Sequence, residues 1–244
     1  MQIIEDKTLV LRTRNPDKIK QRIPKSKTLD INEDVHTMSV KWDLPTAQRL
    51  AGLRMKNIPS PIIRDYDWGG VFPPMEHQKT TAEFLTLNPR SFCFNEQGTG
   101  KTAACVWASD YLITQGYIRR VLVVCPLSIM QSAWQADLFQ FAVHRSVGIA
   151  YGSKEKRSEV IKSNYEYVVV NYDGVNVVQE EIKNGGFDLI IIDEANAYKT
   201  ATTKRWKTMA KLVTANTWVW MLTGTPAAQS PIDAHGLAKL CVPH

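Results

Sequence analysis

Apolar residues follow a regular alternation in the larger, carboxyl-terminal part of the chain. Near-continuous apolar runs, such as RVLVVC (120–125), YVVV (167–170) and FDLIIID (187–193), are separated by amphipathic stretches. Uninterrupted apolar runs are typical of strands that are buried on both faces, as in a parallel sheet covered by helices. Strands are predicted at 91–95, 120–125, 146–150, 166–171, 187–192 and 217–222, and helices at 76–86, 101–115, 128–141, 153–163, 201–214 and 231–241. Strands that alternate with helices predict an α/β fold with right-handed crossovers.

Residues 1–57 show a different pattern, which predicts a small α+β module. TLVLRT (8–13) and TMSVKWD (37–43) are predicted as strands, and the segment from Leu44 to Met55 has apolar residues at helical spacing. Pro16 is expected at the first position of a short helix with Asn15 as its cap. Residues 58–74 are rich in Pro and Gly and are predicted to be a linker to the main domain at 75–244.

Composition places the chain among ordinary globular proteins, with 44% hydrophobic and 22% charged residues in 244. No apolar run approaches the roughly 18 residues of a membrane span, and the amino terminus lacks an apolar signal core. An intracellular protein without a membrane partner is therefore expected. The four cysteines form no close pair and are predicted to be buried, reduced thiols, namely Cys93, Cys105, Cys125 and Cys241.

The net charge of +6 is concentrated near the amino terminus. Residues 1–70 contain 13 Lys/Arg and 9 Asp/Glu, an excess of four. This excess permits nucleic-acid binding, although solvated surface lysines would give the same count. Trp42 is predicted to belong to the core and not to a base-stacking platform. Side chains of the module that could contact phosphate are Lys18, Lys20, Arg22, Lys25 and Lys27.

The segment CFNEQGTGKT (93–102) indicates a phosphate-binding loop between a predicted strand and a predicted helix. Backbone N–H groups at a helix amino terminus bind phosphate, and the helix dipole favours the anion. Gly98, Thr99 and Gly100 would form the cradle, in which the glycines let the backbone approach and turn. Lys101 would reach the β- and γ-phosphates and Thr102 would hold Mg²⁺. Asn95 occupies the place of the usual first glycine, which is tolerated if that position does not need a positive φ.

A pair of carboxylates at the end of another predicted strand supports ATP and Mg²⁺ as cofactors. Asp193 and Glu194 end FDLIIIDE, about 90 residues after the loop. In P-loop NTPases an acid at a strand end holds the metal, so Asp193 is assigned to Mg²⁺. Glu194 is assigned to the attacking water. Alternatively, the two acids would only cap the following helix.

Five segments together resemble the Swi/Snf family of superfamily 2 helicases and translocases. EQGTGKT (96–102) and DEAN (193–196) resemble motifs I and II. VLVVCPLSIMQSAWQADLFQF (121–141) resembles motif Ia of this family, in which Cys-Pro-Leu-Ser precedes a Trp. WMLTGTPAAQSPIDAHGLAKL (220–240) resembles motif III, and PPMEHQKTTAEFL (73–85) resembles the segment whose Gln reads adenine. The resemblance covers residues 73–244 and implies a RecA-like P-loop NTPase lobe.

The resemblance also implies roles for residues outside the phosphate loop. Gln78 would hydrogen-bond adenine, while Asn196, Thr223 and Thr225 would couple the nucleotide site to the DNA-binding face. Backbone phosphates of duplex or branched DNA would be contacted by Pro126, Leu127, Ser128, Gln131, Asn171 and Tyr172. The segment VKWDLPTAQRLAGL (40–53) is similar to a small basic domain that precedes the motor in annealing helicases of this family and engages forked DNA.

The sequence departs from the family pattern at three places. Asn95 replaces an acid or glycine, and Asn196 replaces the histidine of DEAH. Family members continue beyond motif III into a second RecA-like lobe that supplies an arginine finger, whereas this sequence ends at His244. A second lobe, from a longer chain or in trans, is therefore an expected partner, and weak ATP hydrolysis is expected without it.

Two other functions are compatible with the sequence. One is an RNA helicase of superfamily 2, but the residues of motifs Ia and III argue against it. The other is a non-hydrolysing, DNA-binding regulatory half-motor, for which Glu194 would be dispensable.

Overall fold

The computed structural model describes residues 1–96, 98–224 and 231–242. Contacts divide the chain into two compact units. The first comprises Met1–Asp67 with Thr86–Asn88, and the second comprises Trp68–Leu85 with Pro89–His244.

The first unit is built on a four-stranded antiparallel sheet in the order β1-β2-β4-β3. Its strands are β1 (Gln2–Ile4), β2 (Thr8–Thr13), β3 (Lys27–Asn32) and β4 (Val35–Lys41). The helices are α1 (Pro16–Arg22), α2 (Leu44–Gly52) and α3 (Ile62–Asp65). Alternate residues of β2 and β4 are buried, so the two central strands supply one face of a small core. The strands β1 and β3 were not predicted, and α3 lies inside the segment predicted as a linker.

Local interactions in this unit confirm two expectations and correct one. Helix α1 begins at Pro16 as predicted, but the Asn15 side chain makes no capping hydrogen bond. Instead the Asn15 N–H donates to Oγ1 of Thr13, so the proline alone sets the start of the helix. Trp42 is 3% exposed, and its indole N–H donates to the Pro59 carbonyl at 2.9 Å. The prediction that Trp42 belongs to the core is confirmed.

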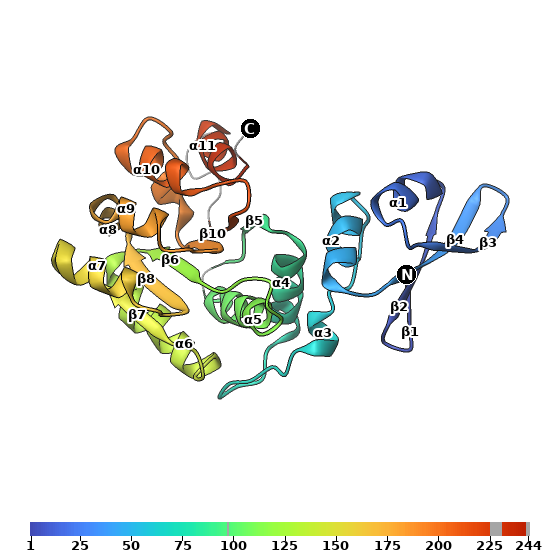
Figure 1. Cartoon of the computed structure of the whole chain (residues 1–244), viewed down its shortest axis with the longest axis horizontal. Coiled ribbons are helices and arrows are strands. Elements are labelled where there is room, and N and C mark those ends of the chain that lie inside the picture. Colours follow the sequence, from blue (N-terminus) through green and yellow to red (C-terminus); the bar gives the residue numbers. More distant parts are fainter. Residues whose placement is uncertain (97, 225–230, 243–244) are drawn as a thin grey trace. The chain divides into compact units, whose positions relative to one another are not determined.

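The second unit contains a six-stranded parallel sheet in the order β5-β10-β9-β6-β8-β7 (Figure 1). The strands are β5 (Arg90–Cys93), β6 (Val121–Cys125), β7 (Val147–Ala150), β8 (Tyr167–Asn171), β9 (Leu189–Ile192) and β10 (Trp218–Leu222). The longer helices are α4 (Glu76–Leu87), α5 (Lys101–Thr114), α7 (Lys154–Lys162), α10 (Lys204–Leu212) and α11 (Pro231–Cys241). All six predicted strands are present, and the predicted α/β fold with a parallel sheet is confirmed.

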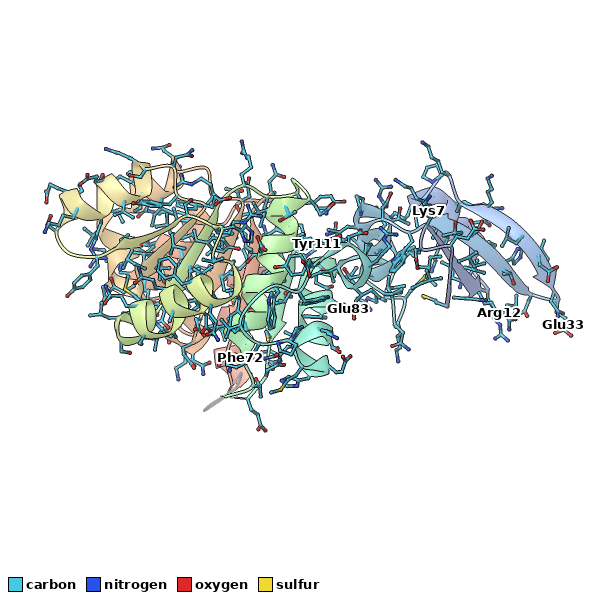
Figure 2. All side chains as sticks on the ribbon, turned by 90° about the horizontal axis from the view of Figure 1, so that it is seen from below. Lys7, Arg12, Glu33, Phe72, Glu83 and Tyr111 are labelled. Carbon is cyan, nitrogen blue, oxygen red and sulfur yellow. The ribbon has the colours of Figure 1, made fainter. Side chains whose placement is uncertain are left out.

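Helices cover both faces of this sheet, and their side chains fill the space beside it (Figure 2). One face carries a continuous apolar cluster that joins alternate strand residues to side chains from α7 and from α8 (Tyr172–Val177), α9 (Gln179–Lys183), α10 and α11. Helix α5 lies on the other face, where Oγ of Ser109 is 2.8 Å from the hydroxyl of Tyr167 on β8. The four cysteines are buried, as predicted.

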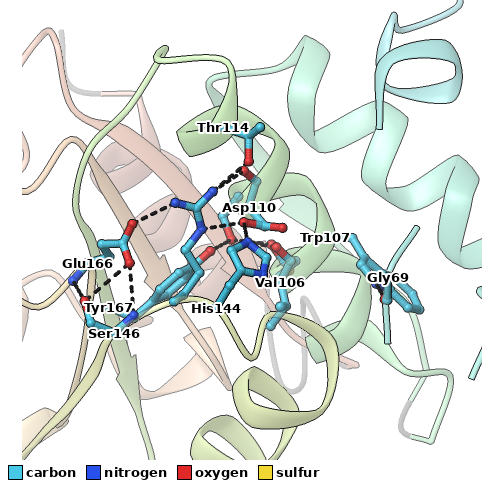
Figure 3. A network of polar contacts seen from close by, with 12 residues as sticks. Gly69, Val106, Trp107, Asp110, Thr114, His144, Ser146, Glu166 and Tyr167 are labelled. Carbon is cyan, nitrogen blue, oxygen red and sulfur yellow. Dashed lines mark hydrogen bonds and ion pairs between the residues drawn. The ribbon is translucent and has the colours of Figure 1, made fainter. Parts of the chain in front are cut away.

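A polar network fixes the amino-terminal ends of β7 and β8 to helix α5 (Figure 3). Arg145 donates to Asp110 on α5 at 2.5 Å and to Glu166 at 2.7 Å. Glu166 in turn accepts from the N–H of Ser146, just before β7. Arg145 pairs with two carboxylates, and these charge-assisted hydrogen bonds stabilise the amino-terminal edge of the sheet.

Three helical regions differ from the prediction. The helix expected at 128–141 is divided into a 3₁₀ turn (Leu127–Ile129), a π-helix (Met130–Gln135) and α6 (Ala136–Phe141). The helix expected at 201–214 begins only at Lys204, because Oγ1 of Thr203 accepts from the Trp206 N–H and caps it. The short helices α8 and α9 were not predicted. Within the described residues, no helix has the length and apolar character needed to cross a membrane.

Candidate functional site

Apart from Gln78, which lies on α4, the predicted site residues end or follow five adjacent strands. Cys93 on β5 pairs with Leu222 on β10, and Met221 pairs with Ile192 on β9. Ile192 also pairs with Val124 on β6, while Cys125 pairs with Asn171 on β8. This register brings the segments that begin at 94, 126, 171, 193 and 223 to one edge of the sheet. That edge is where ligands bind in open α/β folds.

The phosphate loop connects β5 to the amino terminus of α5, as predicted. Gly98 and Gly100 have φ of 80° and 72°, in the left-handed region that glycine adopts without strain. Asn95 is not among the residues with positive φ, which explains why a glycine is not needed there. Gly100 also faces Gln78, and a Cβ at this position would clash with Nε2 of that glutamine. The left-handed turn therefore favours glycine at position 100, and a larger residue would also displace the Gln78 amide.

Lys101 and Thr102 are the first two residues of α5. In this structure Nζ of Lys101 donates to the carbonyl oxygens of Asn95 at 2.8 Å and Glu96 at 3.2 Å. The ammonium group thus lies inside the loop, beside the position that the β- and γ-phosphates would occupy. Thr99 closes the same loop, because its hydroxyl donates to the Glu96 carbonyl at 2.8 Å.

Gln78 lies on α4 against the end of the phosphate loop. Its Oε1 accepts from the Met75 N–H at 2.8 Å, and its Nε2 points to the Thr99 carbonyl at 3.4 Å. A glutamine amide has two lone pairs and two N–H groups. One of each therefore stays available for the donor and acceptor edge of adenine, which glutamine binds in a bidentate manner.

Asp193 is held in a buried position by two donors. Its Oδ2 accepts from the indole N–H of Trp134 at 2.8 Å, and its Oδ1 accepts from the Glu194 N–H at 2.9 Å. Burial raises the pKa of this carboxyl, whereas the two hydrogen bonds and the charge of Lys101 act to lower it. Lys101 opens α5 after the loop that follows β5, and Asp193 follows β9, so the fold places both predicted residues at the same edge of the sheet.

Glu194 adopts a left-handed backbone conformation, with φ of 47° and ψ of 56°. The Tyr172 hydroxyl donates to the Asp193 carbonyl at 2.6 Å and is 3.2 Å from the Glu194 carbonyl. The Glu194 side chain makes no capping hydrogen bond to the 3₁₀ helix Ala195–Tyr198 that follows. This geometry does not support the alternative in which the carboxylates only cap a helix.

The residues present fit a magnesium ion. Thr102 offers a hydroxyl and Asp193 a carboxylate, which are the oxygen ligands that Mg²⁺ prefers, with water completing its shell. Each Asp193 oxygen accepts one hydrogen bond and keeps a further lone pair. When bound, the ion would offset the negative charge of the nucleotide phosphates.

The predicted coupling residues occupy two neighbouring segments. Thr223 directly follows β10, is fully buried, and its N–H donates to the Cys93 carbonyl at 3.1 Å. Asn196 lies in the 3₁₀ helix after Glu194. Thr225 falls outside the described residues. The coupling role of all three stays a prediction.

Four of the six residues predicted to contact DNA follow β6. Pro126 precedes the 3₁₀ turn, and a hollow of about 310 Å³ is lined by Leu127, Ser128 and Gln131 together with Tyr151 and neighbouring side chains. Leu127 is 53% exposed. These positions are accessible to a ligand, and their contact with DNA stays a prediction.

The other two predicted contacts, Asn171 and Tyr172, have partners within the protein. Oδ1 of Asn171 accepts from the buried Arg157, which also donates to the carbonyls of Ala150 and Gly152. Tyr172 uses its hydroxyl to hold the Asp193 turn. Both side chains therefore stabilise the fold, and their contacts with DNA stay a prediction.

Sequence reasoning gave no role to Trp134, Thr81 or the Tyr172 hydroxyl. Trp134 entered only as part of the motif Ia resemblance, although its indole holds the metal-binding candidate Asp193. The sequence signal was the tryptophan itself, since a buried indole N–H needs an acceptor. Nothing in the sequence pairs Thr81 with Asn95, although their side chains are hydrogen-bonded.

Comparison with known proteins gives a consistent family. Residues 77–244 match the SNF2-related domain. "ATP-dependent helicase fft2" from Schizosaccharomyces pombe is 30% identical over 159 residues, which cover 62% of this chain and 12% of that protein. A Caenorhabditis elegans protein, "SWI/SNF-related matrix-associated actin-dependent regulator of chromatin subfamily A-like protein 1 homolog", is 27% identical over 202 residues, or 80% of this chain and 28% of that protein.

A phage relative and a solved structure extend this picture. "Putative protein p41" of Acyrthosiphon pisum secondary endosymbiont phage 1 is 29% identical over 177 residues, covering 68% of this chain and 38% of that protein. The chain thus matches well under half the length of these relatives. The structure "Sulfolobus solfataricus SWI2/SNF2 ATPase core in complex with dsDNA" has a TM-score of 0.60 at 23% identity and covers 69% of this chain and 35% of that one. This likeness confirms the predicted RecA-like fold.

Proposed function

The chain belongs to the SNF2-related domain family, and we propose that it is the ATP-binding lobe of a Swi/Snf-type motor that moves along duplex DNA. The observation that carries this proposal is the placement of Lys101 and Asp193 at one edge of the sheet. Lys101 opens α5 directly after the loop that follows β5, and Asp193 directly follows β9, which β10 alone separates from β5.

In this proposal the residues at the carboxyl edge of the sheet, together with Gln78 on α4, bind the nucleotide. Gln78 binds adenine, and the backbone of Gly98, Thr99 and Gly100 binds the phosphates. Lys101 exchanges its two loop carbonyls for phosphate oxygens, which are stronger acceptors because they are charged.

The hydrolytic step depends on the turn after β9. Glu194 would orient or deprotonate the attacking water from its left-handed backbone position, while Asp193 and Thr102 hold Mg²⁺. The strain of a non-glycine left-handed residue is about 1–2 kcal/mol. The Tyr172 hydroxyl and the carboxylate of Asp193, which accepts the Glu194 N–H, offset it.

The DNA strand would lie along the segments after β6 and β8. Contacts from Ser128, Gln131 and backbone groups to phosphates position a strand without reading its bases. Such binding is expected to weaken steeply as salt is raised. A second lobe would supply the missing transition-state charge, which in related NTPases is worth about 10³–10⁵ in rate. As part of the same proposal, the protein is intracellular and acts on forked or branched DNA.

Steady-state ATP hydrolysis with and without duplex DNA, at low salt, tests this function. We expect saturable ATP–Mg²⁺ binding that is lost in Lys101→Ala, with slow turnover. Glu194→Gln should keep nucleotide binding and remove the residual turnover. Stimulation by duplex RNA but not by DNA would instead indicate an RNA helicase. DNA binding that is unaffected by nucleotide and by Glu194→Gln would indicate a regulatory half-motor.

A further inference from the structure

Helix α4 is hydrogen-bonded to both ends of the phosphate loop. At the start of the loop, Nδ2 of Asn95 donates to Oγ1 of Thr81 at 2.9 Å. At the other end, Nε2 of Gln78 and Nε2 of His77 lie 3.4 Å and 3.0 Å from the Thr99 carbonyl. Thr81 is 9% exposed, so the contact at the start of the loop is largely screened from water.

The Asn95–Thr81 pair is matched in donors and acceptors. The one hydroxyl proton of Thr81 is donated to the His77 carbonyl at 2.8 Å, one helical turn earlier. Its oxygen therefore offers only lone pairs to the loop, and the Asn95 amide nitrogen supplies the proton. The carbonyl of the same Asn95 accepts from Nζ of Lys101. One residue thus joins α4 to the lysine that would bind phosphate.

We propose that Asn95 and Thr81 are positioning residues that fix the phosphate loop to α4 and thereby couple adenine recognition by Gln78 to phosphate binding by the loop. This inference rests on the nucleotide site proposed above. Gln78 and Thr81 are three residues apart on α4 and so share a face of the helix. The phosphate loop would hold the nucleotide at the start of α5. Gln78 can then hydrogen-bond the adenine base only if α4 keeps a fixed position relative to the loop.

Thr81→Val tests the coupling, because it keeps the shape of the side chain and removes the acceptor oxygen. We expect the Kd for ATP to rise about tenfold, which corresponds to about 1.4 kcal/mol. The Kd for GTP, which Gln78 does not favour, should change less than about twofold, a small difference on the same scale. The preference for ATP over GTP therefore falls. Asn95→Ala should give the same result from the other side of the bond. Both constants are measured by displacement of a fluorescent ATP analogue in the presence of Mg²⁺.

Helix α4 offers a matched control next to Thr81. Thr80 makes the same bond to a carbonyl one turn earlier, from its hydroxyl to Glu76 at 2.9 Å, but it lies on the exposed side. Thr80→Val should leave both nucleotide constants unchanged. Thr81→Ser keeps the hydroxyl and should restore the preference for ATP. Thermal unfolding of each variant confirms that the comparison is made on folded protein.

Two results would overturn the coupling. One is a Thr81→Val variant that binds ATP as the unsubstituted chain does, and the other is an equal loss of ATP and GTP affinity with the preference unchanged. The second result would mean that the bond only stabilises the loop. Failure of the unsubstituted chain to bind any nucleotide would refute the proposed function itself, and the coupling with it.

Discussion

The Tyr172 hydroxyl offers a sharp test of the turn that presents Asp193 and Glu194. Tyr172→Phe removes one oxygen and keeps the ring, which contacts the Tyr198 ring edge-on at 5.7 Å and lies 5.0 Å from the Arg205 guanidinium. The lost bond is the 2.6 Å contact with the Asp193 carbonyl. Phenylalanine therefore changes the hydrogen bonding of the turn and very little of its packing.

The expected magnitude follows from this one bond. An ordinary internal hydrogen bond contributes about 0.5–1.5 kcal/mol, and a buried carbonyl left without a donor costs about 1–3 kcal/mol. The Tyr172 hydroxyl lies within reach of the carbonyls of Asp193 and Glu194. Water that binds these carbonyls in the variant would recover part of the lost free energy. We expect Tyr172→Phe to lower the free energy of unfolding by about 1–2 kcal/mol, measured by urea denaturation followed by circular dichroism.

Tyr198→Phe is the matched control, because it deletes a hydroxyl of the same kind beside the first. Tyr198 is fully buried, and within the described part of the chain its hydroxyl has no hydrogen-bond partner. Removing an unsatisfied buried hydroxyl should leave stability unchanged or raise it. Equal destabilisation by the two substitutions, or a larger loss in Tyr198→Phe, would refute the hydrogen-bond argument.

The same variant separates binding from chemistry. Tyr172 contacts the backbone of the turn, so Tyr172→Phe should leave the Kd for ATP within about twofold. Turnover should fall by about tenfold, equivalent to about 1.4 kcal/mol in the barrier, because the turn that presents Glu194 loses one of the hydrogen bonds that hold it. A loss of affinity with unchanged turnover would contradict the assigned role.

Two further substitutions test the phosphate loop and helix α6. Gly100→Ala should weaken nucleotide binding by about five- to thirtyfold, because a left-handed φ of 72° costs an L-residue about 1–2 kcal/mol and the new Cβ displaces the Gln78 amide; an isothermal titration like that of the unsubstituted chain would contradict this. Burial raises the pKa of Asp137 on α6 to about 6, so the folded state holds its proton more tightly than the unfolded state, and stability falls as pH rises from about 4 to about 6. Asp137→Asn should therefore be more stable by about 1–2 kcal/mol at pH 7.5 and no different at pH 4, as urea denaturation at both pH values would show.

Sequence patterns predicted the large sheet well because its central strands are buried on both faces. VLVVC, YVVV and LIII have no polar alternation, and every residue of β6 and β9 is buried. The short β1 and the edge strand β3 gave no such signal, since five of the six residues of β3 are exposed. Helices α8 and α9 have only six and five residues, too few to show a helical period.

Two side-chain hydrogen bonds at the site could not be predicted from the sequence, because they join residues of different segments. The helix expected at 128–141 contains a π-helical segment that includes Trp134, whose indole reaches Asp193 across 59 positions of sequence. Likewise, Thr81 and Asn95 belong to different segments, and only the folded loop brings them together. Motif spacing places the phosphate loop and the carboxylates, whereas the groups that hold them depend on packing.

The order of the strands makes the lobe tolerant of change in its connections. The Asp193 N–H donates to the Val124 carbonyl at 2.9 Å. Asp193 and the segment after β6, which is predicted to contact DNA, therefore start one strand spacing apart, about 5 Å. Chain inserted in the surface crossovers, such as those between β6 and β8, would leave this register untouched. Longer crossovers can therefore be accommodated while the register that sets the distance between Asp193 and the segment after β6 stays the same.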